Sequence, residues 1–293
     1  MKATNKYLLL AACSQLALLG SPQAHAVNLI TNGDFSSTNA DIVNQQIGVA
    51  NSAVGGGAVA AVTGWVSGTV ANPLTPSTGA VSNLNFIFGP SNTATVGVTG
   101  NGADGFGALT KYTPNGSLSS PPDATGNNTR LSLYSSVNSP SLPGVSVIPS
   151  SSPNGGNFVA LDGSADVGPL SQQLSGLTIG NQYDLSFYWA AAQQKGYQAS
   201  GLTELLKVSL GSQSISTAQI SYAQYTFQDW RQVTMRFTAD SVSPVLSFLS
   251  VGTPDGLPPF ALLDGVSLEA VPEPSAALLG SLGVLALLRR RRA

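Results

Sequence analysis

The sequence predicts an all-β protein, built as an antiparallel β-sandwich between two apolar terminal segments that are expected to be helical. Runs with apolar side chains at alternate positions recur in the second half of the chain, and Gly, Pro, Asn or Asp bounds each run. The first half excludes long helices. Residues 42–156 carry only four charges in 115 positions and are rich in Gly, Ser, Asn, Thr and Pro.

Residues 1–26 have the parts of an export signal. Lys2 and Lys6 precede an apolar run over 7–19, and small residues at Ala24 and Ala26 predict cleavage by signal peptidase after Ala26. An alternative remains open, because Leu-Ala-Ala-Cys at 10–13 matches a lipobox that would make Cys13 a lipidated first residue. Both interpretations take the protein out of the cytoplasm.

The charge balance of the intervening body, residues 27–270, excludes two classes of partner. Without the lysines of the head and the arginines of the tail, the body keeps 6 basic residues against 13 acidic ones. Nucleic acids and anionic membrane surfaces are bound through clustered Lys and Arg, so neither is expected as a partner of this body. Its 244 residues suffice for one large domain or two small ones.

Much catalytic chemistry is excluded as well. His25 is the only histidine and Cys13 the only cysteine, and both lie in the predicted signal. The body therefore has no residues for a Ser-His-Asp triad, a thiol nucleophile, a His-ligated zinc or a disulfide. A pair of carboxylates, as in glycoside hydrolysis, and a Ser-Lys arrangement remain.

The second half of the body, residues 157–270, carries 13 charges and 13 of the body's 20 aromatic residues, so we expect the better-defined core there. In the run over 183–189, bulky side chains alternate with Asp184 and Ser186, which predicts a strand with one buried face. The expected strands are Asn157–Leu161, Tyr183–Trp189, Leu205–Leu210, Val233–Phe237, Val245–Val251 and Phe260–Leu268.

The C-terminal segment 271–293 combines a motif, an apolar stretch and a basic cluster. The apolar stretch over 275–288 has 14 residues, or about 21 Å as a helix, against about 30 Å for a bilayer core. The basic cluster predicts a cytoplasmic C-terminus. The short stretch favours a transient stop-transfer signal, and an ordinary tail anchor is the alternative. The motif and cluster residues are Val271, Pro272, Glu273, Pro274, Arg289, Arg290, Arg291 and Arg292.

These three parts, in this order and together with an N-terminal signal, resemble the PEP-CTERM sorting signal of Gram-negative bacteria. The resemblance covers 23 residues and implies processing by an exosortase during export, with transient insertion in the inner membrane. It further implies a final place at the cell surface or outside the cell, commonly in organisms that make extracellular polysaccharide.

The body resembles the galactose-binding-like jelly rolls, among them many carbohydrate-binding modules. The likeness rests on Asn28–Phe35 with Gly64-Trp65, on Phe158–Gly163 and Leu177–Phe187, and on the closing Leu262–Leu268. It implies that the opening and closing motifs pair near the chain termini. Residues 66–156 do not match and are expected to form a large insertion of loops and edge strands or a second β layer.

Such jelly rolls often hold a structural calcium near their termini, and the resemblance places Asp264 and Asp34 as its acids. Ser36 stands where the family has Glu, which removes one hard oxygen ligand. The alternative is that Asp264 accepts hydrogen bonds in a turn before the last strand. No other cofactor is expected.

Tryptophans and acids are the remaining candidates for a site. Trp65 follows Gly64 in a polar stretch and is the open candidate for stacking on a sugar, whereas Trp189 and Trp230 are expected in the core. The Gly-rich segment 99–107 has a single calcium-type repeat, which we interpret as a loop. The acids considered for a hydrolytic pair are Asp162, Asp166, Asp184, Glu204 and Asp229, with Glu204 expected at a strand edge.

The sequence therefore predicts an exported, C-terminally sorted and non-catalytic protein of the surface or extracellular matrix, with polysaccharide as an expected partner. The alternative is a secreted polysaccharide hydrolase that uses two acids.

Overall fold

The computed structural model describes residues 27–39, 45–48, 60–68, 70–71, 81–82, 84–88, 133, 152–164, 167–193, 200–224, 226–254 and 259–272. Asn28–Val271 forms one compact unit, apart from the terminal segments Met1–Val27 and Pro272–Ala293. The helices expected in 1–26 and 275–288 lie outside the described residues.

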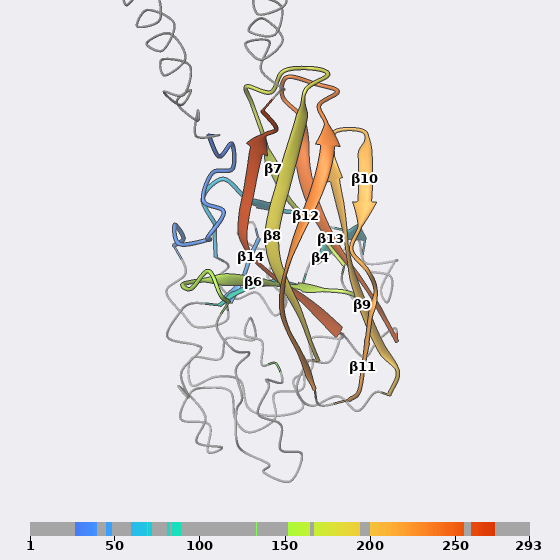
Figure 1. Ribbon diagram of the computed structural model, residues 1–293. Coiled ribbons are helices and arrows are strands. Elements are labelled where there is room, and N and C mark those ends of the chain that lie inside the picture. Colours follow the sequence, from blue (N-terminus) through green and yellow to red (C-terminus); the bar gives the residue numbers. More distant parts are fainter. Residues whose placement is uncertain are drawn as a thin grey trace, which may run out of the picture. The chain divides into compact units, whose positions relative to one another are not determined.

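The first sheet has six strands in the order β1-β5-β6-β14-β8-β12, and all neighbours are antiparallel. Its long strands β14, β8 and β12 run alongside one another in Figure 1. The bounds are β1 Gln45–Gln46, β5 Asn85–Phe88, β6 Phe158–Asp162, β14 Pro259–Ala270, β8 Gln182–Gln193 and β12 Phe227–Thr238.

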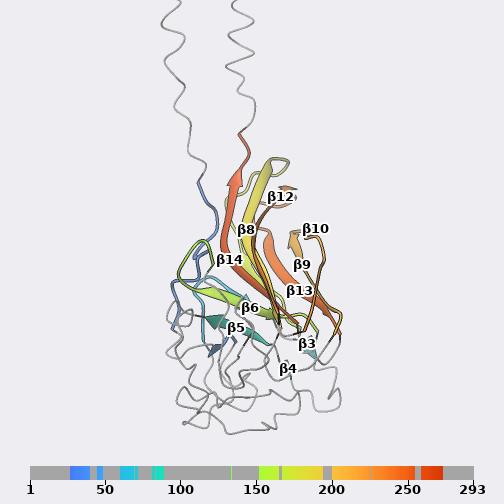
Figure 2. The same ribbon diagram turned by 60° about the horizontal axis from the view of Figure 1, so that its bottom comes forward.

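The second sheet has the order β10-β9-β13-β7-β2, and β11 also pairs with β9. Figure 2 shows β13, β9 and β10 as a layer beside β14 and β8. The bounds are β10 Gln213–Ser216, β9 Leu202–Leu210, β13 Val245–Thr253, β7 Leu170–Gln173, β2 Val66–Ser67 and β11 Ile220–Tyr222. A separate two-stranded sheet pairs β3 Val70–Ala71 with β4 Val81–Ser82.

The main core lies between the two sheets. Odd-numbered residues of β8 from Tyr183 to Ala191 face it, and even-numbered residues of β9 face it from the other side. Phe187 of β8 meets Phe248 of β13 edge to face, with ring centroids 5.2 Å apart. The alternation read from the sequence therefore has its physical cause in two inward faces that exclude water.

A second apolar cluster covers part of the opposite face of the first sheet. The even-numbered Phe158 and Ala160 of β6 and Phe260 and Leu262 of β14 belong to it, and so does Leu133. Strands β6 and β14 are thus apolar on both faces over these residues, unlike the half-buried strands that simple alternation predicts.

The fold class is confirmed, because the described residues form the two antiparallel sheets of a sandwich and one small two-stranded sheet, and contain no helix. All six expected strands exist, most of them longer than expected. Within the 66–156 insertion, β5 is completely buried and pairs with β6, so this part belongs to the sandwich itself. Its polar Asn85 donates from Nδ2 to Ser67 Oγ and Gly168 O, while its Oδ1 has no hydrogen-bond partner among the described residues.

The pairing of the chain's opening and closing motifs is also confirmed. Val266 N donates to Gly33 O at 2.9 Å, and Leu29 N donates to Leu268 O at the same distance. The opening segment is not a regular strand, however, because Asn32 and Phe35 have positive φ values of 54° and 53°. These two positions interrupt the extended conformation of the segment beside β14.

Candidate functional site

Asp264 lies where the opening segment meets the last strand. It sits at an irregularity of β14, where the register with β8 shifts between Asp264 and Ser267. Gly265 follows with φ 60°, a conformation that favours glycine, and a Cβ on it would come within 3.0 Å of Tyr188 Cδ2. The Asp264 carboxyl lies near enough to Asp34 of the opening segment for the charge of Asp34 to act on it.

The Asp264 carboxyl is fully buried and only partly satisfied. Its Oδ1 accepts from Gly265 N at 2.6 Å, and its Oδ2 has no hydrogen-bond partner among the described residues. Burial raises its pKa to about 7; the charge of Asp34 adds to the rise, while polar contacts with Ser152 and Asn154 oppose it. An acid in this state either takes up a proton near neutral pH or is compensated by a cation.

The polar side chains near Asp264 are those of Asp34, Ser152 and Asn154, which offer carboxylate, hydroxyl and amide oxygens as metal ligands. Oxygen ligands suit calcium better than zinc. Asp34 is exposed, and its Oδ1 accepts from Ser36 N at 3.3 Å and Ser36 Oγ at 3.0 Å. Ser36 therefore supports Asp34 instead of supplying a carboxylate. Within the described ranges, no group of three or more His, Cys, Asp or Glu residues is placed to hold a metal.

Trp65 corrects our expectation of an exposed indole. The side chain is 5% exposed, its ring lies against Phe35 and Phe248 at centroid distances of 5.3 and 6.1 Å, and its Nε1 donates to Asn32 O. Because both neighbours belong to the core, no face of this indole is free to stack on a sugar. Trp65 joins the opening segment to the core.

The other face of the first sheet, here called the outer face, carries polar side chains along its long strands. Arg236 of β12 donates to both Asp184 oxygens at 2.8 Å, through Nε and the terminal nitrogen. This pairing lowers the pKa of Asp184. Tyr188 of β8 is half-buried on the same face. Its cross-strand partners are Gln232 of β12 on one side and Asp264 of β14 on the other.

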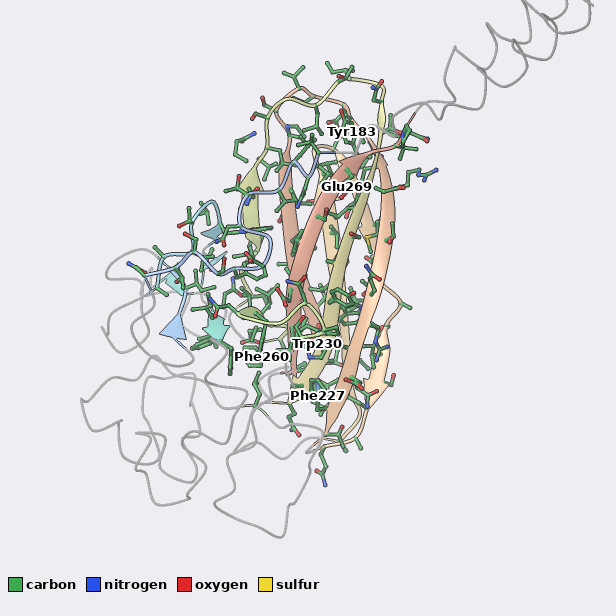
Figure 3. The ribbon with its side chains drawn as sticks, turned by 60° about the vertical axis from the view of Figure 1, so that its left-hand side comes forward. Tyr183, Phe227, Trp230, Phe260 and Glu269 are labelled. Carbon is green, nitrogen blue, oxygen red and sulfur yellow. The ribbon has the colours of Figure 1, made fainter. Side chains whose placement is uncertain are left out.

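Aromatic side chains continue this face toward the other end of the sheet. Figure 3 shows Phe260, Trp230 and Phe227 there, while Tyr183 and Glu269 lie at the opposite end of the long strands. Trp230 is half-buried and meets Phe158 edge to face at 5.5 Å. Trp189 faces the inner core and is 1% exposed, as expected. The outer face thus combines two half-buried aromatic rings with hydrogen-bonding side chains.

Two of the considered acids lie close together, but neither can reach a solvent-borne substrate. Asp162 and Glu204 are both 0% exposed. Burial is the main reason that the pKa of Glu204 is raised, and the charge of Asp162 raises it further. Glu204 corrects our expectation of a strand-edge charge: β9 begins at Leu202, so its alternation points Glu204 inward. Asp229 is exposed, and Asp166 lies outside the described residues.

The carboxyl of Glu204 occupies room left by two glycines. A Cβ on Gly163 or on Gly252 would come within 2.3 or 2.7 Å of its Oε2. Its Oε1 accepts from Ser250 Oγ and Leu205 N, while Oε2 has no hydrogen-bond partner among the described residues. Sequence reasoning missed this site because Gly163 and Gly252 only follow the expected strands Asn157–Leu161 and Val245–Val251, and nothing in the pattern shows that they lie together beside Glu204.

Most residues of the sorting and cleavage predictions lie outside the described part of the chain: Ala24, Ala26, Glu273, Pro274, Arg289, Arg290, Arg291 and Arg292. Val271 and Pro272 are described, and Val271 N donates to Gln182 O at 2.9 Å. Among the described residues there is no helix of the length and apolar character needed to cross a membrane.

Comparison with known proteins gives structural likenesses alone. No family model and no curated protein matches the chain. Similar solved structures include the N-terminal cellulose-binding domain of a Cellulomonas fimi β-1,4-glucanase (19% identity, 40% of this chain and 79% of that one, TM-score 0.26). Another is the C-terminal domain of EclA, a sugar-binding protein (15% identity, 45% of this chain and 89% of that one, TM-score 0.29). A third is an adhesin domain of Lys-gingipain from Porphyromonas gingivalis w83 (17% identity, 43% of this chain and 81% of that one, TM-score 0.30). With TM-scores of 0.26 to 0.30, these likenesses indicate no ligand and no activity for this chain.

Proposed function

We propose that the protein is an exported, non-catalytic surface or matrix protein whose sandwich binds glycan on the outer face. One observation supports this most: half-buried Tyr188 and Trp230 share that face with the hydrogen-bonding side chains of Gln232, Asp184 and Arg236. Aromatic rings pack against the apolar faces of sugar rings, while amides, acids and guanidinium groups bond their hydroxyls. A polysaccharide strand is the class of ligand that an extended sheet face suits.

Hydrolysis is the competing function, and the burial of Asp162 with Glu204 disfavours it. A panel of polysaccharides incubated with the purified protein separates the two, read for retention of protein and for released reducing ends. Retention without release is the expected result. Steady release that disappears in Asp184→Asn or Asp229→Asn, the exposed acids, would replace binding by catalysis.

The C-terminal segment is proposed as a sorting signal that is removed during export. We expect protein recovered from its source cells to lack Arg289–Arg292 and to end near 271–274, because a 14-residue apolar stretch anchors poorly. Intact-mass measurement tests this, and an added lipid or glycan mass would fit the same proposal. A recovered chain that still ends at Ala293 would contradict processing and favour a lasting tail anchor.

A structural calcium between Asp264 and Asp34 is proposed as a support of the fold. An ion bound only by the folded state stabilises it by about 2.7 kcal/mol at a hundredfold excess over its dissociation constant. A chelator should therefore lower the thermal midpoint, and calcium should restore it where magnesium does not. Asp264→Asn should abolish this response, whereas the matched exposed variant Asp229→Asn should keep it. A midpoint that ignores the chelator would remove calcium from the site.

A further inference from the structure

Two turns lie side by side at one end of the sandwich and are here called the exit pole. They are residues 174–181, between β7 and β8, and residues 239–244, between β12 and β13. Backbone bonds join them: Leu174 N donates to Pro244 O, Leu177 N to Val242 O and Gly180 N to Ala239 O, at 2.8–3.2 Å. The two turns therefore form one bonded surface.

The exit pole exposes apolar side chains where turns usually carry polar ones. Ile179 is 61% exposed and Val242 is 55% exposed, and Val245, which follows at the start of β13, is 44% exposed. Single exposed apolar residues are common on protein surfaces and need no explanation. Here, however, three branched side chains come from two bonded turns and the strand that follows them.

The chain leaves the sandwich at this same end. Val271 N donates to Gln182 O, and Gln182 follows directly after the first of the two turns. From Pro272, only three residue steps lead to the apolar stretch that begins at Ser275, a reach of at most about 11 Å. A body whose C-terminal stretch is inserted in a bilayer would therefore hold the exit pole close to the lipid surface.

The two turns of the pole carry a single charged side chain. The two turns contain no Lys or Arg, and their single acid is Asp240. The Asp240 carboxylate accepts from Ser212 N at 2.7 Å and also from Ser212 Oγ, and these bonds lower its pKa. Ser212 supplies two hydrogen bonds to this acid, which stays ionised and is expected at the hydrated level of the headgroups rather than among the acyl chains. The two turns have no basic group that would draw the pole to anionic headgroups.

We propose that the exit pole is a lipid-contacting surface, with Ile179 and Val242 lying in the headgroup region of a phospholipid bilayer while the C-terminal segment is inserted. The inference rests on the proposed sorting function, in which the C-terminal segment is inserted in the membrane before it is removed. It adds to it an orientation of the body: the exit pole faces the membrane, and the outer sheet face stands along the side, free to meet a polysaccharide.

Site-specific fluorescence tests this orientation. Cys13→Ala makes the full chain free of cysteine, so Ile179→Cys and Val242→Cys can each carry a bimane label. Val251→Cys is the matched control, a 42% exposed valine at the other end of β13, where it pairs with Leu205. The protein is expressed in an exporting bacterial host, purified from its membranes and reconstituted into phosphatidylcholine vesicles, with or without bromine on the acyl carbons nearest the headgroups.

Labels at 179 and 242 are expected to lose about half of their emission in brominated vesicles, since interfacial side chains lie about 5–10 Å deep. The label at 251 should keep its emission. Flotation of the vesicles reports insertion separately: protein that floats with all three labels unquenched would overturn the lipid contact and leave insertion standing. Protein that does not float would overturn both. Blue-shifted but unquenched labels at the pole would indicate contact with a second protein copy and contradict the proposal, as would equal quenching at 251.

Discussion

Replacing Trp65 by alanine is expected to lower the free energy of unfolding by about 3–5 kcal/mol, the range for large aromatic side chains removed from cores. The variant would lose ring contacts with Phe35 and Phe248 and the bond from Nε1 to Asn32 O. These contacts hold the opening segment, so its pairing with β14 should weaken as well. Denaturant unfolding followed by circular dichroism measures the change.

Val66→Ala is the matched control, because Val66 is the next residue and is 62% exposed. It should change the free energy of unfolding by less than about 0.5 kcal/mol. If both variants unfolded like the natural protein, Trp65 would not be the core residue described here, and an exposed indole available to a sugar would again be the better interpretation.

Glu204→Gln is expected to make the protein more stable at neutral and alkaline pH. Burial raises the pKa of Glu204 in the folded state well above its value of 4.5 in an unfolded chain. The stability that its neutral form contributes is complete below pH 4.5 and is lost as the pH rises through the folded-state pKa. Each unit of that rise corresponds to about 1.4 kcal/mol.

The amide suits the site. Its oxygen can keep the bonds from Ser250 Oγ and Leu205 N, while its NH₂ replaces the unpartnered Oε2. Unfolding of both proteins across pH 4–9 measures the effect, and the difference between them isolates Glu204 from Asp264, whose raised pKa acts in the same direction. Curves that stay parallel over this range would contradict a neutral Glu204 in the fold.

The strands that could be predicted from the sequence are those with one apolar and one polar face, such as β8 and β13. Alternation failed at β5, because its four residues are all buried and lie in a region nearly free of charge, which leaves no contrast to detect. It failed again at Glu204, since an acid at an inward position looks like the end of a strand. That position is tolerated because Gly163 and Gly252 leave room for the carboxyl.

The candidate site was only partly accessible from the sequence. Asp34 and Asp264 could be placed together, since the opening and closing motifs were expected to pair. The contributions of Ser152 and Asn154 could not, because they come from a loop before β6 with no pattern of its own. Tyr188 and Gln232 become neighbours only through the register of β8 with β12, which no local signal in either strand specifies.

Binding of glycan to the outer face is the central claim. The most direct test is the affinity of matched variants for a glycan that retains the protein in the panel. Tyr188→Ala and Gln232→Ala should each weaken binding. A loss of about 1.4 kcal/mol of binding free energy raises the dissociation constant about tenfold. Leu249→Ala, a half-buried side chain on the outward face of the other sheet, should bind like the natural protein, with unfolding midpoints confirming that all variants fold. Unchanged affinity in both outer-face variants, or equal loss in Leu249→Ala, would contradict the account.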